Sequence, residues 1–206
     1  MFTKFMNLDP DKRDRILIAA MKEFAEKGYE KASTNEIVNG AQISKGLLFH
    51  YFKNKKQLYM FLYDYALEFM ITEFYKRIDM QERDLFKIIK NAGRVKLEIM
   101  KKNPHVFPFL QVTYLETSPE VKDELNMKGM QALQTNMQKT FENADVSKLK
   151  PGLDLQTVTN IITWTSEGLA NNELRKYRLQ GRDIDYDELF AASDHYMNVL
   201  KDCFYK

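Results

Sequence analysis

Cysteine, histidine and long apolar runs are all scarce in this chain of 206 residues. Its one cysteine, Cys203, cannot form an internal disulfide, and we expect it only to pack within a C-terminal helix. No stretch reaches the roughly 18 uncharged apolar residues of a membrane span, and residues 1–7 lack the apolar core of a secretory signal. We therefore expect no membrane association and a cytoplasmic location.

Three common enzyme motifs are also missing. The chain has no glycine-rich phosphate loop, no H-E-x-x-H sequence and no nucleophile-elbow pentapeptide, and its histidines are only His50, His105 and His195. Carboxylate pairs such as Glu116 with Glu120 are better explained as a solvated helix face. We therefore predict that the protein is not an enzyme and has no catalytic residues, no metal site and no cofactor.

Charge is unevenly distributed, although the formal net charge is only +2. The first 60 residues hold 11 Lys or Arg against 7 Asp or Glu, so the basic excess lies entirely in this part. Localised positive charge favours a surface that faces phosphates, but ordinary surface composition explains it equally well. With 44% apolar residues and five prolines, the chain has the composition of a globular protein.

Apolar residues recur at three-to-four spacing in nearly every segment, and no run shows the alternation of a strand. The sequence therefore predicts an all-α fold. Helix starts are marked by a residue that can cap the first turn, often followed by proline or by glutamate or glutamine at the third position. We expect helices to begin at Asp9–Pro10 (ending at Gly28), at Ser33 with Glu36 as its capping-box partner, at Ser44, Asn54, Leu85, Asn103–Pro104, Ser118–Pro119 and Asp154, and, after a link of residues 179–185, at Asp185.

No repeat, low-complexity tract or flexible linker divides the chain. The helices expected before Asn54 are short, and those after it are long. We therefore place a domain boundary inside the helix that follows Asn54, with residues 1–55 as one domain and residues 56–206 as the other.

Two short helices joined by a three-to-four-residue turn are expected between Ser33 and Leu58, which is the spacing of a helix-turn-helix. The second of them begins with Ser44, Lys45 and Gly46. Free backbone N–H groups and the helix dipole at this end can meet an anion or a base edge. Gly46 has no side chain to hold such a group away.

The rest of this second helix divides into two faces. His50 and Tyr51 present polar tips, while Leu48 and Phe52, four residues apart, are expected to face inward. Lysines then crowd the start of the next helix, at positions 53, 55 and 56. They oppose the dipole of that helix, which is best explained if phosphates neutralise them.

At these residues the chain resembles the tetracycline-repressor (TetR) family of bacterial transcription regulators. The similarity runs from about Ile16 to Leu58 and follows the family pattern T-x-x-I-A and then A-G-V-S-K-G-x-L-Y-x-Y-F-x-x-K-x-x-L. The segments that carry it are Thr34-Asn35-Glu36-Ile37, Ile43-Ser44-Lys45-Gly46, Leu48-Phe49-His50-Tyr51-Phe52, Lys55 and Leu58. Most positions agree with the pattern, but Phe49 stands where the family usually has tyrosine, and Gln42 replaces the usual turn glycine.

The resemblance implies roles for seven residues. Thr34 and Tyr51 would contact phosphates, and Lys55 would fix the register on the DNA backbone. The residues that would face the major groove are Ser44, Lys45, Gly46 and His50. Phe49 lacks the hydroxyl for a phosphate contact, and Gln42 puts a side chain where the family's glycine is free to adopt a positive φ.

The resemblance also implies that residues 56–206 bind a small molecule and dimerise. Large aromatic and methionine side chains suited to an apolar pocket are spread through this part of the chain. We expect Phe107, Tyr114 and Trp164 to contact the ligand, which would then have apolar or aromatic character. Plain core packing remains the open alternative for each of them.

The last two expected helices, residues 155–178 and 186–204, correspond to the pair with which the family forms a four-helix interface between subunits. Gly168 could admit a closely packed partner helix. The apolar stripes of the two helices hold Leu155, Val158, Ile162, Thr165, Leu169, Leu189, Tyr196, Met197 and Leu200. Burial of the same stripes within one chain is the open alternative.

The sequence thus predicts a ligand-responsive transcriptional regulator, with repression as the family's majority habit. It would bind a palindromic operator in double-stranded DNA as a homodimer and be released by a small-molecule effector. Two other classes stay open: an all-helical protein-interaction module, and a small-molecule carrier without operator binding. The lysines at positions 53–56 favour DNA over the first, and nothing in the sequence excludes the second.

Overall fold

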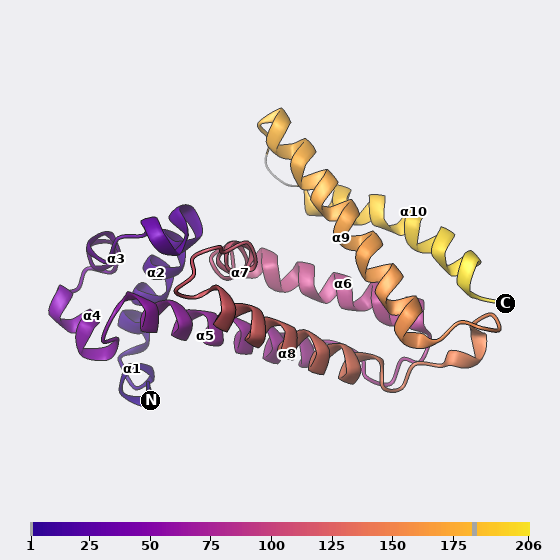
Figure 1. Cartoon of the computed structure of the whole chain (residues 1–206), viewed down its shortest axis with the longest axis horizontal. Helices are drawn as coiled ribbons and strands as arrows, with labels where there is room; N and C mark the ends of the chain where they lie inside the picture. Colours follow the sequence, from indigo (N-terminus) through magenta and orange to yellow (C-terminus); the bar gives the residue numbers. More distant parts are fainter. Residues whose placement is uncertain (1, 183–184) are drawn as a thin grey trace. The chain divides into compact units, whose positions relative to one another are not determined.

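Ten α-helices and one short 3₁₀ helix make up most of the described chain (Figure 1). This computed structural model describes residues 2–182 and 185–206, and residues 183–184 of the expected link lie outside the described residues. Within those ranges no strand is present, and the prediction of an all-α fold is confirmed. The helices are α1 (Thr3–Met6), α2 (Pro10–Lys31), α3 (Thr34–Ala41), α4 (Lys45–Tyr51), α5 (Lys55–Tyr75), α6 (Leu85–Lys102), α7 (Val106–Tyr114), α8 (Lys122–Phe141), η1 (Val146–Lys148), α9 (Leu155–Gln180) and α10 (Tyr186–Phe204).

The chain divides into two compact units. Unit 1 comprises the residues up to Ile78 together with Glu98–Lys139, and unit 2 comprises Asp79–Leu97 together with Thr140–Lys206. Unit 1 thus holds α1–α5, α7 and most of α8, unit 2 holds η1, α9 and α10, and α6 passes from one to the other. The expected domain boundary at residue 55 stays a prediction.

The core of unit 1 forms around α2. The apolar face of this helix has the expected spacing, and its residues Ile16, Ala20 and Phe24 are fully buried. Helices α3 and α7 make the most extensive contacts with α2, and α5 also packs against it. Ile37 of α3 and Phe109 of α7 are fully buried in the same cluster, so the helix-turn-helix and α7 share one core.

Five expected helix starts are confirmed by a hydrogen bond to the capping side chain. In each, a side-chain oxygen accepts a backbone N–H of the first turn at 2.8–3.2 Å. These bonds satisfy donors that the helix itself leaves open. The capping residues are Asp9, Ser44, Asn54, Asp154 and Asp185. The expected break at Gly28 is also present, where the helical geometry of α2 is interrupted by a φ of 69°.

Two expected helix starts are wrong by a few residues. The side chain of Asn103 donates to the Ile99 carbonyl at 2.8 Å, so it closes the end of α6 and does not cap α7, which begins only at Val106. Residues 118–121 form a separate turn, and α8 begins at Lys122. Both proline-containing segments therefore end in a turn before the next helix starts.

A short helix that the periodicity did not predict, α1, covers one end of the unit 1 core. The rings of Phe2 and Phe5 lie with their centroids 4.7–5.4 Å from those of Phe52 and Phe61. Aromatic contacts of this kind contribute more than their buried area alone. Because Phe52 immediately follows α4, this cluster holds the C-terminal end of that helix in place.

Helices α9 and α10 lie side by side in unit 2 (Figure 1). Val158 and Ile162 of α9 are buried in one cluster with Leu85 and Phe86 from the start of α6. Val158 and Ile162 belong to the apolar stripe expected at a dimer interface. Their burial within the chain means that this part of the stripe is not available to a partner subunit. Cys203 is exposed, which corrects the expectation that it packs in the protein.

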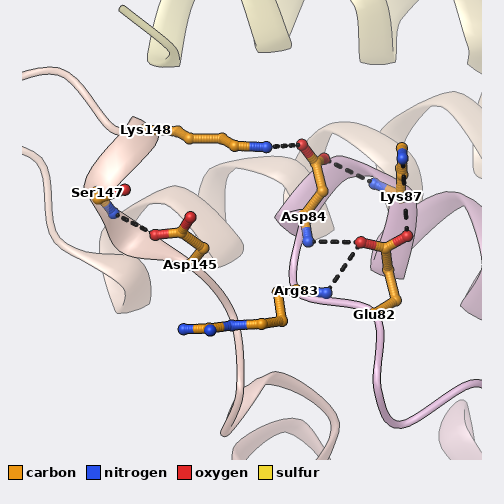
Figure 2. Close-up of polar contacts among 7 residues, drawn as sticks. All are labelled: Glu82, Arg83, Asp84, Lys87, Asp145, Ser147 and Lys148. Carbon is orange, nitrogen blue, oxygen red and sulfur yellow. Dashed lines mark hydrogen bonds and ion pairs between the residues drawn. The ribbon is translucent and has the colours of Figure 1, made fainter.

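Polar contacts connect the start of α6 to η1 (Figure 2). Asp84 accepts from Lys148 Nζ at 2.8 Å and from the Lys87 N–H at 3.2 Å, while Glu82 Oε1 accepts the N–H groups of Arg83 and Asp84. Burial alone would raise the pKa of the Asp84 carboxyl, but its bonds to Lys148 and to the Lys87 N–H lower that pKa below its usual value. The network therefore fixes the entry into α6.

Replacement of Gln42 by glycine is expected to stabilise the protein. Among the described residues, Gln42 is the only residue other than glycine with a positive φ (54°, with ψ 49°). That conformation costs an L-residue about 1–2 kcal/mol, and glycine removes this strain. Part of the gain is offset because glycine has greater conformational freedom in the unfolded chain. We expect Gln42→Gly to raise the free energy of unfolding by about 0.5–1 kcal/mol in urea titrations. Gln42→Ala keeps the strain, so equal stability of the two variants would contradict the prediction.

Candidate nucleic-acid interface

A sharp turn joins α3 to α4. Gln42 in the left-handed region ends α3, with its N–H donating to the Asn39 carbonyl at 3.1 Å and the Ile43 N–H donating to the Val38 carbonyl at 3.0 Å. These two bonds satisfy carbonyls that the last turn of a helix leaves open. Only residues 42–44 separate the two helices, so the helix-turn-helix spacing predicted from the sequence is present.

The N-terminal end of α4 is open to solvent. Ser44 caps it by accepting the Leu47 N–H at 3.2 Å, and Ser44, Lys45 and Gly46 are all exposed. A Cβ added at Gly46 would have no atom within 4 Å among its described neighbours. The fold thus gives no steric reason for glycine at this position. The first N–H groups of the helix and its dipole point out of the protein here.

The inner face of α4 fixes its orientation. Leu48 is 1% exposed and Phe52 0% exposed, as the four-residue spacing predicts. Tyr51 is half-buried, with its ring 5.7 Å from that of Phe5, and His50 is exposed with its ring 5.1 Å from that of Tyr51. Polar and apolar side chains of α4 therefore lie on the faces assigned to them.

Two of the three lysines at positions 53–56 already have partners in the protein. Lys55 Nζ donates to the carbonyls of Glu30 (3.0 Å) and Ala32 (3.4 Å), and Lys56 Nζ lies 3.7 Å from a Glu124 oxygen. Lys55 therefore helps to close the C-terminal end of α2. The cluster of lysines alone therefore does not indicate a phosphate-binding site. Lys55 still has a third N–H donor that could bind a phosphate.

The last turn of α2 and the residues that lead into α3 are held by two carboxylates. Ser33 precedes α3 but makes no side-chain cap, which corrects the expected capping box, and its N–H donates to Glu23 Oε1 at 2.9 Å. Glu116, which follows α7, accepts the Tyr29 N–H at 2.8 Å just after the break at Gly28. Thr34, the first residue of α3, is thereby placed next to a fixed turn.

Glu116 is not the solvated carboxylate expected from the sequence. It is half-buried, and besides Tyr29 it accepts the N–H groups of Thr117 and Ser118, both at 2.9 Å. Burial alone would raise its pKa, but the N–H groups of Ser118, Tyr29 and Thr117 lower it below the usual value. No local pattern in the sequence indicates this contact, because 87 positions separate Glu116 from Tyr29.

The structure places the three residues expected to bind a ligand in different settings. Phe107 is half-buried on α7, Tyr114 at the end of α7 is 82% exposed, and Trp164 on α9 is 65% exposed. Unit 1 contains a cavity of about 340 Å³, and none of the three lines it. Their role in ligand binding stays a prediction.

Neither a metal site nor a membrane span is found in the described part of the chain. No group of three or more His, Cys, Asp or Glu side chains in residues 2–182 and 185–206 is placed to hold a metal ion. Over the same ranges, none of the helices combines the length and apolarity that crossing a membrane requires.

The chain is similar to known bacterial regulatory proteins in sequence and in fold. Residues 16–60 match the family described as bacterial regulatory proteins, tetR family. The chain is 27% identical over 200 residues to the probable acrEF/envCD operon repressor of Escherichia coli strain K12, covering 92% of this chain and 85% of that protein. A TetR family transcriptional regulator from Chloroflexus aurantiacus has the same fold, with 20% identity, a TM-score of 0.69, and coverage of 98% of this chain and 97% of that chain. The protein in the SmeT–triclosan complex also has this fold, with 16% identity, a TM-score of 0.71, and coverage of 95% of this chain and 92% of that chain.

The three helices α2–α4, with the exposed end of α4, form a helix-turn-helix of the kind that reads DNA. The matched residues 16–60 span most of α2, all of α3 and α4, and the start of α5. The chain is therefore similar to bacterial regulatory proteins of the tetR family, in sequence at residues 16–60 and in its fold over most of its length.

Glu116→Gln is expected to destabilise the protein in a pH-dependent way. The pKa of Glu116 is lowered in the folded state, so its stabilising contribution is present above the carboxyl's unfolded pKa and is lost as the pH falls through the folded pKa. We expect the variant to lose about 1.5–3 kcal/mol of unfolding free energy at pH 7 and less below about pH 4. Urea titrations across this pH range measure the difference. Glu142→Gln, which changes an exposed carboxylate, is the control, and equal losses in both variants would refute the assignment.

Proposed function

We propose that the protein is a transcriptional repressor that binds a palindromic operator as a homodimer and is released by a small-molecule effector. The observation that carries the proposal is the end of α4, where exposed Ser44, Lys45 and Gly46 surround N–H groups that point out of the protein. A helix end of this kind suits an anion or a base edge in the major groove. Such a protein acts in the cytoplasm, where its DNA is, and needs no catalytic residue.

Contacts with DNA divide into two kinds in this proposal. Thr34, Tyr51 and Lys55 contact phosphates, which position the protein on the duplex without reading its sequence. Base edges are read by the exposed residues of α4, namely Ser44, Lys45, Gly46 and His50. The burial pattern supports this division, since Thr34, Tyr51 and Lys55 are half-buried and the other four are exposed.

Dimerisation is proposed through the exposed side of α9 and α10. Ile162 is buried in the unit 2 core, and at 100° per residue Trp164 points about 200° away from it on α9. Gly168 follows Trp164 by one turn, is exposed, and has open space around its Cβ position. On α10, Tyr196 and Val199 are 47% and 48% exposed. A large aromatic side chain beside an open glycine is a typical centre for a helix–helix interface.

Release by a small molecule is the last part of the proposal. SmeT, which shares this fold, forms a complex with triclosan, and the Escherichia coli relative is a probable operon repressor. For this chain, an effector that favours a spacing of the two α4 helices other than about 34–36 Å would release the operator. Thermodynamic linkage then requires operator DNA to weaken effector binding by the same factor.

Gly46→Ala is expected to separate DNA binding from folding. The added methyl group meets nothing in the protein, so the thermal midpoint should stay equal or rise, as alanine is the better helix former by up to about 1 kcal/mol. Operator affinity should fall about tenfold or more, because the methyl group stands between α4 and the groove. Fluorescence anisotropy on labelled duplexes from the source genome, at several salt concentrations, measures both selectivity and affinity.

Two further variants serve as controls in the same titrations. Lys45→Ala should weaken operator binding and flatten its salt dependence, whereas Lys122→Ala removes one charge from an exposed position on α8 and should leave both unchanged. Selective binding that Gly46→Ala and Lys45→Ala leave intact would refute the interface. Wild-type protein that binds no duplex selectively, with or without effector, would refute the repressor.

The proposed dimer can be followed by the fluorescence of the single tryptophan, Trp164. Its indole is 65% exposed in one chain and becomes covered in the dimer. The emission maximum should therefore shift to longer wavelength on dilution from micromolar to nanomolar concentration. Light scattering should give the mass of a dimer for the wild type and for Val146→Gln, and a smaller mass for Gly168→Gln. A concentration-independent spectrum together with a monomeric mass would show that the chain does not dimerise.

A further inference from the structure

The cavity in unit 1 lies where three elements meet. Its walls come from α2, from α5 and from the segment that ends α6 and begins α7. Its volume of about 340 Å³ falls in the range of small-molecule sites. A molecule bound here would touch the helix that supports the helix-turn-helix and the helices that follow it.

Most of the inner wall is apolar. Leu17 and Met21 of α2 are almost fully buried, and Phe69 of α5 is half-buried. Ile18, on the same helix as Leu17, remains 43% exposed although it lines the cavity. Removing apolar surface from water is favourable, so an apolar or aromatic group of a ligand would bind against this wall.

One side of the cavity carries the positive charge of Lys102 beside the imidazole of His105. Lys102 is the last residue of α6, and His105 precedes α7 without capping it through its side chain. Within the described residues, no carboxylate oxygen lies within 4.0 Å of the side-chain nitrogens of Lys102 or His105. Asp14, the one acidic residue in the lining, is already paired with Arg13 at 3.2 Å. An anionic group is therefore the complement of this side.

Tyr65 adds a polar group to the lining. It is half-buried, and its ring stacks on that of Phe61 with centroids 6.2 Å apart. Burial, with a smaller contribution from Asp14, raises the pKa of its phenol above the usual value. The hydroxyl therefore keeps its proton at neutral pH and can donate it to an oxygen of a ligand.

We propose that this cavity binds an amphipathic carboxylate, with its apolar or aromatic part between α2 and α5 and its carboxylate at Lys102 and His105. The site is separate from Phe107, Tyr114 and Trp164. The assignment stands on the cavity itself, and only its regulatory consequence rests on the proposed function. Because α2 forms one wall and also packs on α3, occupancy should change operator affinity, and operator should change ligand affinity by the same factor.

Isothermal titration calorimetry of the full chain with 4-phenylbutyrate tests the proposal directly. The uncharged counterpart, 4-phenylbutan-1-ol, has the same apolar part. We expect saturable binding of the carboxylate that is at least fivefold tighter than that of the alcohol. Lys102→Met keeps the aliphatic stem and should remove this preference, whereas Lys122→Met, which changes an exposed lysine on α8, should not.

A second variant locates the ligand. Ile18→Phe changes an exposed side chain, so we expect the variant to fold. Its larger ring takes up space in the cavity and should lower the affinity for both the acid and the alcohol at least fivefold. The absence of saturable binding, equal affinity for acid and alcohol, or affinities unchanged by Lys102→Met and Ile18→Phe would each overturn the proposal. Since no DNA is present in these titrations, a failure of operator binding leaves their outcome unaffected.

Discussion

Burial of one face of α2 is the constraint on which unit 1 depends. Ile16, Ala20 and Phe24 exclude water from the contacts of α2 with α3, α5 and α7. Burial of each of the two larger side chains, Ile16 and Phe24, contributes about 1.5–3 kcal/mol to the free energy of folding. The same packing sets where α3 starts and, through the turn at Gln42, where α4 points. The helix proposed to read DNA and the core of unit 1 are therefore supported by the same side chains.

Local signals allowed much of the fold to be predicted. The caps at Asp9, Ser44 and Asn54 were correct because each involves residues within one turn, and the helix-turn-helix follows from their spacing. The predictions of two caps failed because the capping residue bonds to a group on the preceding helix. Asn103 bonds to the preceding helix, and the N–H of Ser33 finds Glu23. Pattern alone also could not distinguish a dimer stripe from a core stripe, since both have the same period.

The candidate sites show the same division between local and distant information. The exposed residues of α4 were identified because they are consecutive in the sequence. The contact of Glu116 with Tyr29 and the cavity bounded by α2, α5 and the α6–α7 segment join residues from separate parts of the chain. No spacing rule connects Ile18 with Lys102. Only the folded arrangement reveals that an apolar wall faces a cationic rim.

Helix α6 links the two units as one continuous helix, Leu85–Lys102, with the division between residues 97 and 98. If unit 2 unfolded alone, residues 98–102 would have to stay helical without the turns that precede them. A helix needs about 12–15 residues to persist unaided in water, so this remnant would fray. Ile99, which is 1% exposed, would then leave its packed position. Unfolding of unit 2 is therefore expected to reach into unit 1 through the last turn of α6.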